Sequence, residues 1–221
     1  MRRLVTLIIL LQIITMQGIA QKKTISYLAL GDSYTIGESV PSYQNFPNQL
    51  VAMIRSKGID VKDPDIIAKT GWTTGELMTA ISAAKLQPKY DYVTLLIGVN
   101  NQYRGKSVDE YSKEFELLLM KAIKFAGGDT SHVIVVSIPD WGATPFAREK
   151  GSDRAKITEE INAFNTENNH IAYRYKVKYV DITPGSREVL INPELLAEDK
   201  LHPSGIEYKR WAEAILKAME L

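Results

Sequence analysis

The most informative stretch of the sequence is Ile25-Ser26-Tyr27-Leu28-Ala29-Leu30-Gly31-Asp32-Ser33-Tyr34, an apolar run that stops at a glycine and is followed by a serine. The part up to Leu30 mixes β-branched, aromatic and aliphatic residues, which predicts a buried strand. Gly31 permits a sharp turn, so Ser33 is expected at the carboxyl edge of the strand, where open α/β sheets bind their ligands. Ser33 is therefore a candidate nucleophile. Taken alone, Gly-Asp-Ser more often marks only a strand that ends in a polar turn, so the interpretation depends on partners elsewhere in the chain.

Four further apolar runs have the length of strands, and amphipathic patterns typical of helices separate them. The strands are expected at residues 66–69, 92–97, 133–138 and 178–182, and the helices at residues 46–57, 76–85, 107–126, 157–171 and 206–219. Segments 31–47, 98–101, 139–153 and 183–199 are expected to be loops, the last with one short helical turn. Because each parallel strand needs a helical crossover back to the same edge, the pattern predicts an α/β fold with a three-layer, doubly wound, five-stranded parallel sheet.

The first 20 residues have the composition of a secretory signal peptide. Arg2 and Arg3 form a basic start, residues 4–16 form an apolar run, and Gly-Ile-Ala at 18–20 is a small-residue cleavage site. The apolar run is shorter than the roughly 20 residues that a membrane-spanning helix needs, so cleavage after Ala20 is expected rather than retention as an anchor. The expected protein is exported, either to the periplasm or out of the cell. The sequence contains no cysteine, so neither a lipid-modified cysteine nor a disulfide is expected.

Residues 21–221 are expected to form one catalytic domain of ordinary size. Loss of Arg2 and Arg3 changes the formal net charge from +1 to −1. This balanced charge argues against nucleic acid as a partner, and basic and acidic residues are interspersed, as on a solvated surface. The sequence does not indicate an oligomeric state.

A serine nucleophile needs a base to accept its proton, and the sequence offers three histidines. His132 leads into a strand and His170 belongs to an amphipathic helix. His202 differs because it lies in the loop Asp199-Lys200-Leu201-His202-Pro203, with a carboxylate three residues earlier that could orient its ring. The alternative is that Asp199 only caps the turn before Pro203, in which case Asp181 is the next carboxylate to consider.

The negative charge that develops on the substrate oxygen needs hydrogen-bond donors. Candidates follow the second and third strands, in Thr70-Gly71-Trp72-Thr73-Thr74-Gly75 and in Gly98-Val99-Asn100-Asn101. Parallel strands deliver these segments and Ser33 to the same edge of the sheet.

These four motifs, in this order, resemble the SGNH (GDSL) hydrolase family over nearly the whole of residues 21–221. The resemblance implies that Ser33 attacks an ester carbonyl, that His202 is its base, and that Asp199 completes a triad. It also implies an oxyanion hole made of the Ser33 N–H, the N–H of Gly71 or Gly75, and the side-chain amide of Asn100. The family uses neither a metal nor an organic cofactor, and none is expected here.

Two features depart from the family pattern or leave it ambiguous. Many members carry Asp after the third-block asparagine, whereas this chain has Asn101. The second-block glycine is either Gly71, directly after the strand, or Gly75, at the start of the next helix, with a slight preference for Gly71. The chain also lacks a Gly-x-Ser-x-Gly elbow, which argues against the other large serine-esterase fold.

The predicted function is an exported hydrolase of small acyl esters, either lysophospholipase-like or carbohydrate-deacetylating. Trp141 and Phe146 are expected to be exposed, and they either line its substrate groove or only anchor a long loop. One alternative is a non-catalytic ligand-binding module, which would not require Ser33, Asn100 and the Asp199–His202 pair together. Another is a flavodoxin-like signalling domain that uses Asp32, which the export signal and the lack of a phosphate-binding glycine loop disfavour.

Overall fold

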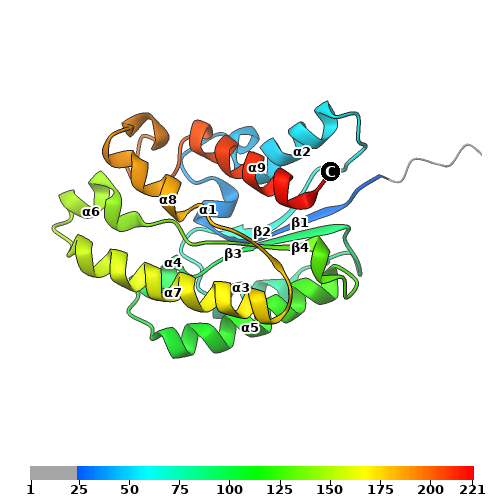
Figure 1. The fold of residues 1–221 in the computed structure, drawn as a ribbon, viewed down its shortest axis with the longest axis horizontal. Coiled ribbons are helices and arrows are strands. Elements are labelled where there is room, and N and C mark those ends of the chain that lie inside the picture. The colour runs from blue at the N-terminus through cyan, green and yellow to red at the C-terminus, as the bar shows by residue number, and fades with distance from the viewer. Residues whose placement is uncertain (1–23) are drawn as a thin grey trace, which may run out of the picture.

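The computed structural model describes residues 24–221, and the expected signal peptide, residues 1–20, lies outside them. Five parallel strands form a single sheet in the order β2-β1-β3-β4-β5 (Figure 1). The strands are β1 (Tyr27–Asp32), β2 (Asp65–Lys69), β3 (Tyr92–Leu96), β4 (Val133–Val136) and β5 (Lys178–Val180). The predicted doubly wound α/β architecture is confirmed. All five predicted strands are present, with ends that differ by a few residues.

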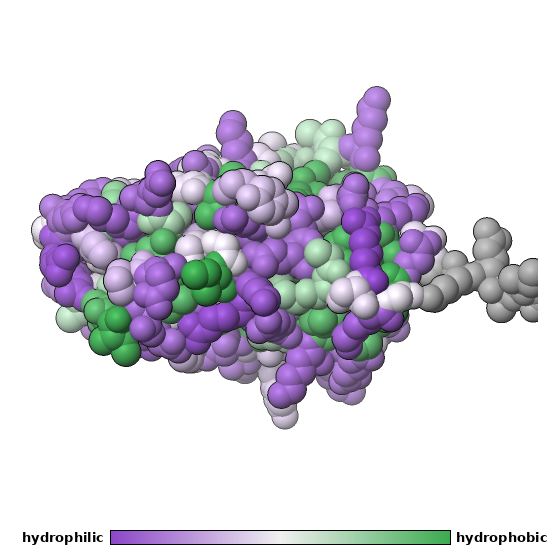
Figure 2. Space-filling model, turned by 90° about the horizontal axis from the view of Figure 1, so that it is seen from above, coloured by the Kyte–Doolittle hydropathy of each residue, from purple (hydrophilic) through white to green (hydrophobic). Residues whose placement is uncertain are grey.

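Helices cover both faces of the sheet. On one side lie α2 (Phe46–Ser56) and α9 (Gly205–Met219), which pack closely on each other, and on the other lie α3 (Thr74–Ala83), α5 (Val108–Phe125) and α7 (Arg154–Arg174) (Figure 1). Figure 2 shows the α2–α9 side from above: hydrophilic residues predominate, and hydrophobic residues occur in separate patches. The apolar stripes of these helices therefore face the sheet, as their sequence periodicity predicts.

The central strands are buried on both faces, which explains their continuous apolar sequences. All six residues of β1 and all five residues of β3 are buried. Among residues 24–221, no helix combines the length and the hydrophobicity needed to cross a membrane.

Short helices and 3₁₀ turns lie in the segments expected as loops, where one short turn was expected within residues 183–199, and also between residue 126 and β4. They are α1 (Ser33–Ile36), α4 (Val99–Tyr103), α6 (Pro145–Glu149) and α8 (Thr183–Ser186), together with the 3₁₀ turns η1 (Ser42–Gln44), η2 (Thr130–His132), η3 (Trp141–Ala143), η4 (Arg187–Leu190) and η5 (Pro193–Leu195). Each has one or two turns, too few for a hydrophobic period to be visible in the sequence.

The predicted role of Gly31 is wrong. The chain stays extended through Asp32, and Gly31 does not have a positive φ. Glycine is required there because a Cβ atom would lie 2.0 Å from Oγ1 of Thr35 and 2.6 Å from the carbonyl oxygen of Leu96. The missing side chain therefore lets α1 fold back closely against the end of the sheet.

Candidate active site

Three neighbouring strands, β2, β1 and β3, bring the expected residues to one edge of the sheet. The chain leaves β1 at Ser33, and Gly71 and Asn100 follow the ends of β2 and β3. The strands end level with one another, because Asp32 pairs with Lys69 and Gly31 with Leu96. The order of strands reverses between β1 and β3, which is where doubly wound sheets form a crevice for ligands.

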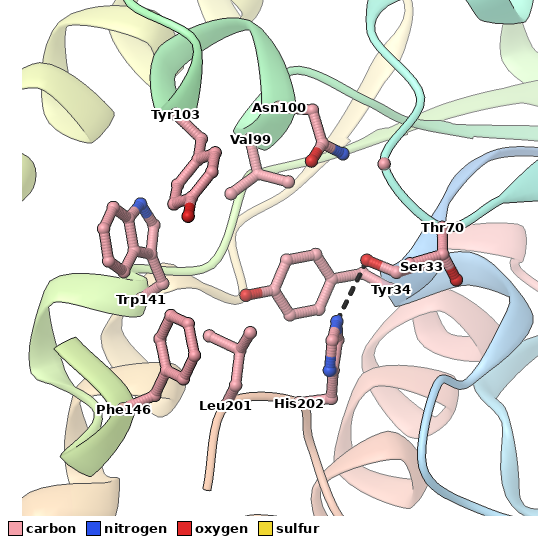
Figure 3. Close-up of a pocket in the computed structure, with 11 residues that line it drawn as sticks. Ser33, Tyr34, Thr70, Val99, Asn100, Tyr103, Trp141, Phe146, Leu201 and His202 are labelled. Carbon is pink, nitrogen blue, oxygen red and sulfur yellow. Dashed lines mark hydrogen bonds between the residues drawn. The ribbon is translucent and has the colours of Figure 1, made fainter. Parts of the chain in front are cut away.

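The side chains of Ser33, His202 and Asp199 form a continuous chain of hydrogen bonds. Nε2 of His202 lies 3.0 Å from Oγ of Ser33 (Figure 3). Nδ1 of His202 lies 2.5 Å from Oδ2 of Asp199. Ser33 and His202 are both buried. Although 169 positions separate the serine from the histidine, the loop before α9 places the imidazole beside the first turn of α1.

Asp199 is held in place by donors other than the imidazole. Its Oδ1 accepts the backbone N–H groups of Leu201 (3.0 Å) and His202 (2.9 Å), and its Oδ2 accepts the hydroxyl of Ser39 (2.7 Å). Partial burial works to raise the pKa of Asp199, but the hydrogen bonds from His202, Ser39 and the two backbone groups outweigh it and lower the pKa to about 2. Asp199 is therefore a carboxylate at neutral pH. It both caps the turn and contacts the imidazole, so the two roles weighed from the sequence coexist.

Asp181, the other carboxylate considered, has different partners. Its Oδ1 accepts the hydroxyl of Ser137 (2.9 Å) and the N–H of Thr183 (3.0 Å). It stands beyond the end of β5 and does not line the cavity next to Ser33.

The two glycines considered for the oxyanion hole lie in different places. Gly71 lines the same cavity as Ser33, Asn100 and His202, and its φ of +85° is one that glycine adopts without strain. Its carbonyl accepts Nη2 of Arg104 at 2.5 Å, which fixes the orientation of this turn. Gly75 lies inside α3, next to Glu114, and does not line the cavity. The geometry therefore brings Gly71, not Gly75, to the serine.

Asn100 reaches the cavity from the first turn of α4. Its Nδ2 donates to the carbonyl of Trp72 at 3.0 Å, which fixes the plane of the amide and ties α4 to the turn after β2. The Ser33 N–H lies in the first turn of α1, where helical N–H groups have no acceptor within the helix. Ser33, Gly71 and Asn100, which follow three neighbouring strands, thus line the same cavity.

The next residue, Asn101, is fully buried and braces the same turn. Its Oδ1 accepts the N–H of Thr74 (3.0 Å), and its Nδ2 donates to Oγ1 of Thr74 (2.6 Å). The hydroxyl of Thr74 in turn donates to Glu114. Asn101 therefore links the segment after β3 to the start of α3 without a carboxylate at that position.

Asp32, immediately before the serine, is buried and caps α1 by accepting the N–H of Tyr34 at 3.0 Å. Its other oxygen, Oδ2, has no hydrogen-bond partner among the described residues. Burial raises the pKa of Asp32 to about 7, although backbone hydrogen bonds, including that of Tyr34, act in the opposite direction. The residue directly before the serine in the sequence is therefore a buried carboxyl group whose pKa lies well above its ordinary value.

An apolar cavity of about 180 Å³ opens beside Ser33 (Figure 3). Its walls away from the serine are Tyr34, Val99, Tyr103, Trp141, Phe146 and Leu201. Trp141 and Phe146 do line this cavity, but Trp141 is 6% exposed, not exposed as its place in a long loop suggested. The arrangement combines a nucleophile and base with an apolar pocket of the kind that holds small ligands.

Sequence reasoning missed several residues of this site. Tyr103 lies three residues after Asn100 on α4, and this spacing places both on one helical face, a signal that becomes readable only if α4 is recognised as a helix. Ser39 and Tyr34 carry no motif that distinguishes them. His132, as expected, lies at the opposite end of the strands, where its ring centroid is 4.8 Å from that of Tyr92.

Chemically, this arrangement suits acyl transfer. An imidazole between a carboxylate and a hydroxyl can accept the hydroxyl proton, and clustered N–H donors can stabilise an oxyanion. The same features occur in serine hydrolases on unrelated folds.

Comparison with known proteins agrees with this chemistry. The model of the GDSL-like lipase/acylhydrolase family matches residues 29–210. A sequence search of curated proteins found no match.

Solved structures with a similar fold include several esterases and lipases. One is a member of the lipolytic G-D-S-L family from Veillonella parvula, with a TM-score of 0.66 and 18% identity over 87% of this chain and 96% of that chain. Another is an acetylxylan esterase from Geobacillus stearothermophilus, with a TM-score of 0.70 and 19% identity over 89% and 94% of the two chains. A lipase/acylhydrolase from Enterococcus faecalis has a TM-score of 0.70 and 18% identity over 89% and 96%. At these identities the likeness establishes the fold.

The family model covers most of the chain, and the resemblance inferred from the four motifs is confirmed. The chain belongs to the GDSL-like lipase/acylhydrolase family, whose members are carboxylic-ester hydrolases.

Proposed function

We propose that the protein hydrolyses esters of small acyl groups through a triad of Ser33, His202 and Asp199. The observation that carries the proposal is the unbroken hydrogen-bond chain from Asp199 through His202 to Ser33, with contacts of 2.5 Å and 3.0 Å. This is the arrangement in which an imidazole can accept a hydroxyl proton while a carboxylate stabilises the imidazolium that forms.

In the acylation step, Oγ of Ser33 attacks the ester carbonyl carbon and Nε2 of His202 takes the hydroxyl proton. The tetrahedral intermediate collapses when its bond to the alcohol oxygen breaks, and His202 returns the proton to that oxygen. The alcohol leaves and the acyl group remains on Ser33. A water molecule then repeats the sequence: His202 takes its proton, the hydroxide adds to the acyl carbon, and the carboxylic acid is released as Ser33 regains its proton.

The negative charge on the carbonyl oxygen would be stabilised by the N–H groups of Ser33 and Gly71 and by Nδ2 of Asn100. Support comes from their shared place at the cavity and from the contacts that hold two of them, Arg104 on the Gly71 carbonyl and the Trp72 carbonyl on Asn100. Donors that are already fixed cost no reorganisation during the reaction.

We assign the apolar cavity to the acyl chain. The alcohol departs, and water enters, beside His202, so that side must stay open to solvent. The group that remains on Ser33 between the two steps is the acyl group, and a cavity lined mainly by apolar side chains suits it. Each methylene buried there should raise kcat/KM about fourfold, until the cavity is full.

A series of para-nitrophenyl esters with acyl chains from acetate to octanoate tests this expectation. A panel of lysophospholipids and acetylated sugars distinguishes the two kinds of natural ester.

The experiment that tests the proposed function is hydrolysis of these esters by purified wild-type protein and Ser33→Ala. The variant should lose several orders of magnitude in kcat while keeping the circular dichroism spectrum and melting temperature of the wild type. Substantial turnover by folded Ser33→Ala would contradict the mechanism.

We also propose that the protein is exported after cleavage behind Ala20, which leaves residues 21–221 as one catalytic domain. This rests on the basic start, the apolar run and the small residues of the sequence. Intact-mass measurement of the protein produced by cells that export it should give a chain beginning at Gln21, and a chain that retains residues 1–20 would contradict the proposal.

A further inference from the structure

Trp141 forms the inner wall of the acyl cavity and comes from the loop after β4. Its ring centroid is 5.4 Å from that of Tyr103 and 6.3 Å from that of Phe146, so the three aromatic side chains form one surface. Its indole Nε1 donates to Oε1 of Gln102 at 2.7 Å, and Gln102 donates from Nε2 to Glu160 at 2.7 Å. The indole ring is thus fixed by α4, the helix that also carries Asn100.

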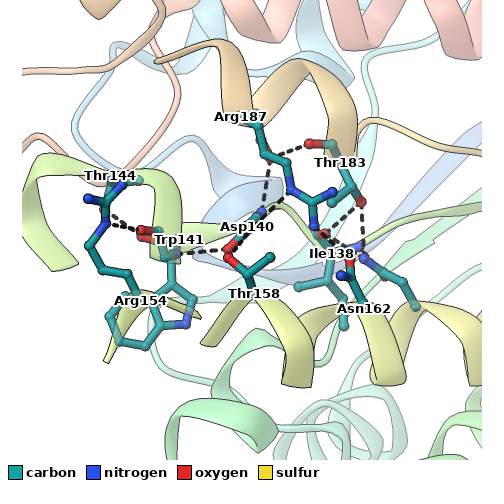
Figure 4. Close-up of polar contacts among 12 residues, drawn as sticks. Ile138, Asp140, Trp141, Thr144, Arg154, Thr158, Asn162, Thr183 and Arg187 are labelled. Carbon is teal, nitrogen blue, oxygen red and sulfur yellow. Dashed lines mark hydrogen bonds and ion pairs between the residues drawn. The ribbon is translucent and has the colours of Figure 1, made fainter. Parts of the chain in front are cut away.

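The residue before Trp141 is a buried carboxylate with partners on every side (Figure 4). Oδ1 of Asp140 accepts the N–H of Gly142 at 2.9 Å, which closes the turn η3. Its Oδ2 accepts the hydroxyl of Thr158 at 2.8 Å and Nε of Arg187 at 2.9 Å. The backbone N–H of Asp140 donates to the hydroxyl of Ser186 at 2.9 Å.

Apart from Gly142 in the adjoining turn η3, these partners come from three separate elements. Thr158 lies on α7, Ser186 on α8 and Arg187 on η4. The side chain of Asp140 is 1% exposed and that of Arg187 is 37% exposed, so the carboxylate is almost fully removed from water. Neither Asp140 nor Arg187 lines the acyl cavity. Their contacts fix the backbone from which the Trp141 side chain projects (Figure 4).

We propose that Asp140, together with Arg187 and Thr158, is a positioning residue that sets the acyl-chain selectivity of the enzyme by fixing Trp141 as the wall of the acyl cavity. This inference rests on the proposed function, because it assigns the cavity to the acyl chain. Asp140 takes no part in the bond-breaking steps. Its effect is confined to acyl groups long enough to reach Trp141, because an acetyl group stays close to Ser33 and the N–H donors.

The test is the ratio of kcat/KM for para-nitrophenyl hexanoate to that for para-nitrophenyl acetate, in wild-type protein and Asp140→Asn. An asparagine can still accept the N–H of Gly142, but its NH₂ group would face Nε of Arg187, a donor against a donor. We expect the hexanoate-to-acetate ratio to fall about tenfold, mainly through a higher KM for hexanoate, with kcat for acetate within about threefold of wild type. Loss of folded protein lowers both rates equally, so the ratio reports on the cavity wall alone.

Two milder variants keep the test decisive if Asp140→Asn folds poorly. Thr158→Val removes one donor to Asp140 and keeps the Arg187 ion pair, and Gln102→Leu frees the indole N–H of Trp141 without touching Asp140. Both should lower the hexanoate-to-acetate ratio, by less than Asp140→Asn does. Asp181→Asn is the matched control, because Asp181 also follows a strand but contacts Ser137 and Thr183 away from the cavity. Its ratio should equal that of wild type.

The outcomes separate the two proposals. An unchanged ratio in folded Asp140→Asn, or in both milder variants, overturns the inference while Ser33-dependent hydrolysis of acetate still supports the proposed function. Absence of hydrolysis by the wild type contradicts the proposed function itself.

Discussion

At the scale of single residues, the contact between Asp199 and His202 determines which ring nitrogen can act as a base. A carboxylate at Nδ1 keeps the proton on that nitrogen and leaves Nε2, 3.0 Å from the serine oxygen, free to accept. An asparagine at position 199 would keep its oxygen toward the backbone N–H groups of Leu201 and His202 and turn its NH₂ group toward Nδ1. The imidazole would then carry its proton on Nε2 and could not accept one from Ser33.

We therefore predict that Asp199→Asn lowers kcat/KM on the pH plateau by roughly 10²- to 10⁴-fold, with little change in stability at neutral pH. The measurement is the pH profile of para-nitrophenyl acetate hydrolysis. The control is Asp181→Asn, which should retain wild-type rates. Equal losses in the two variants would mean that the effect is not specific to the His202 contact.

The second prediction at this scale concerns Asp32 and stability. Burial raises the pKa of Asp32 from 3.8 to about 7, so the folded protein keeps this proton at pH values where the unfolded chain has lost it. The contribution of Asp32 to the free energy of unfolding is therefore fully present below about pH 4 and is lost as the pH rises through about 7. Asp32→Asn cannot ionise and keeps the capping oxygen for the N–H of Tyr34.

Urea unfolding of both proteins from about pH 4 to pH 8 tests this prediction. Between these limits the variant should gain about 4 kcal/mol relative to wild type. A difference that does not change with pH would show that Asp32 is ionised throughout, and would refute the assigned pKa.

The residues that could be predicted from the sequence are those in short local motifs. Ser33, Asn100, His202 and Asp199 each follow a strand or share a loop with a partner, so a few neighbouring residues suffice to single them out. Asp140 could not be found in this way, because its partners Thr158, Ser186 and Arg187 lie 18 to 47 positions further along the chain. Only the fold brings them together.

At the scale of elements, Asn101 joins the end of β3 to the start of α3 through Thr74. The single hydroxyl proton of Thr74 goes to Glu114, and the Asn101 amide donates to the same oxygen. Asn101→Asp would place a second carboxylate against a hydroxyl that has only one proton to donate. We expect a loss of about 1–3 kcal/mol in the free energy of unfolding.

The matched test adds Glu114→Gln to Asn101→Asp. A glutamine amide can donate to Thr74, which frees the hydroxyl proton for the new carboxylate, so the double variant should recover most of the loss in urea unfolding. A double variant no more stable than Asn101→Asp would mean that these three side chains do not act as one unit.

The elements that could not be predicted are the short helices α1 and α4. α1 and α4 have four and five residues, and capping and tertiary contacts, rather than an apolar stripe, stabilise them. Asp32 caps α1 and Asn100 binds the Trp72 carbonyl from α4. Both helices point their first turn at the cavity. The hydrophobic pattern therefore does not show the elements that carry Ser33 and Asn100, two residues of the proposed oxyanion hole.

At the scale of the whole molecule, alternating strands and helices were enough to predict a doubly wound parallel sheet. The pattern does not give the order of the strands, yet that order places Gly71, Ser33 and Asn100 side by side, because β1 lies between β2 and β3. The acyl cavity depends on still more distant segments. Tyr103, Trp141, Phe146 and Leu201 come from three different parts of the chain, and their sequence neighbours do not indicate that they meet.

The central claim is that Ser33 is the nucleophile activated by His202, and covalent trapping tests it most directly. A para-nitrophenyl alkylphosphonate should phosphonylate the wild-type protein once, with release of one equivalent of nitrophenol, and mass spectrometry of the digested protein should locate the adduct on the peptide that contains Ser33. Ser33→Ala should form no adduct, and His202→Ala should form it much more slowly. An adduct on another residue, or equal labelling of Ser33→Ala, would contradict the account.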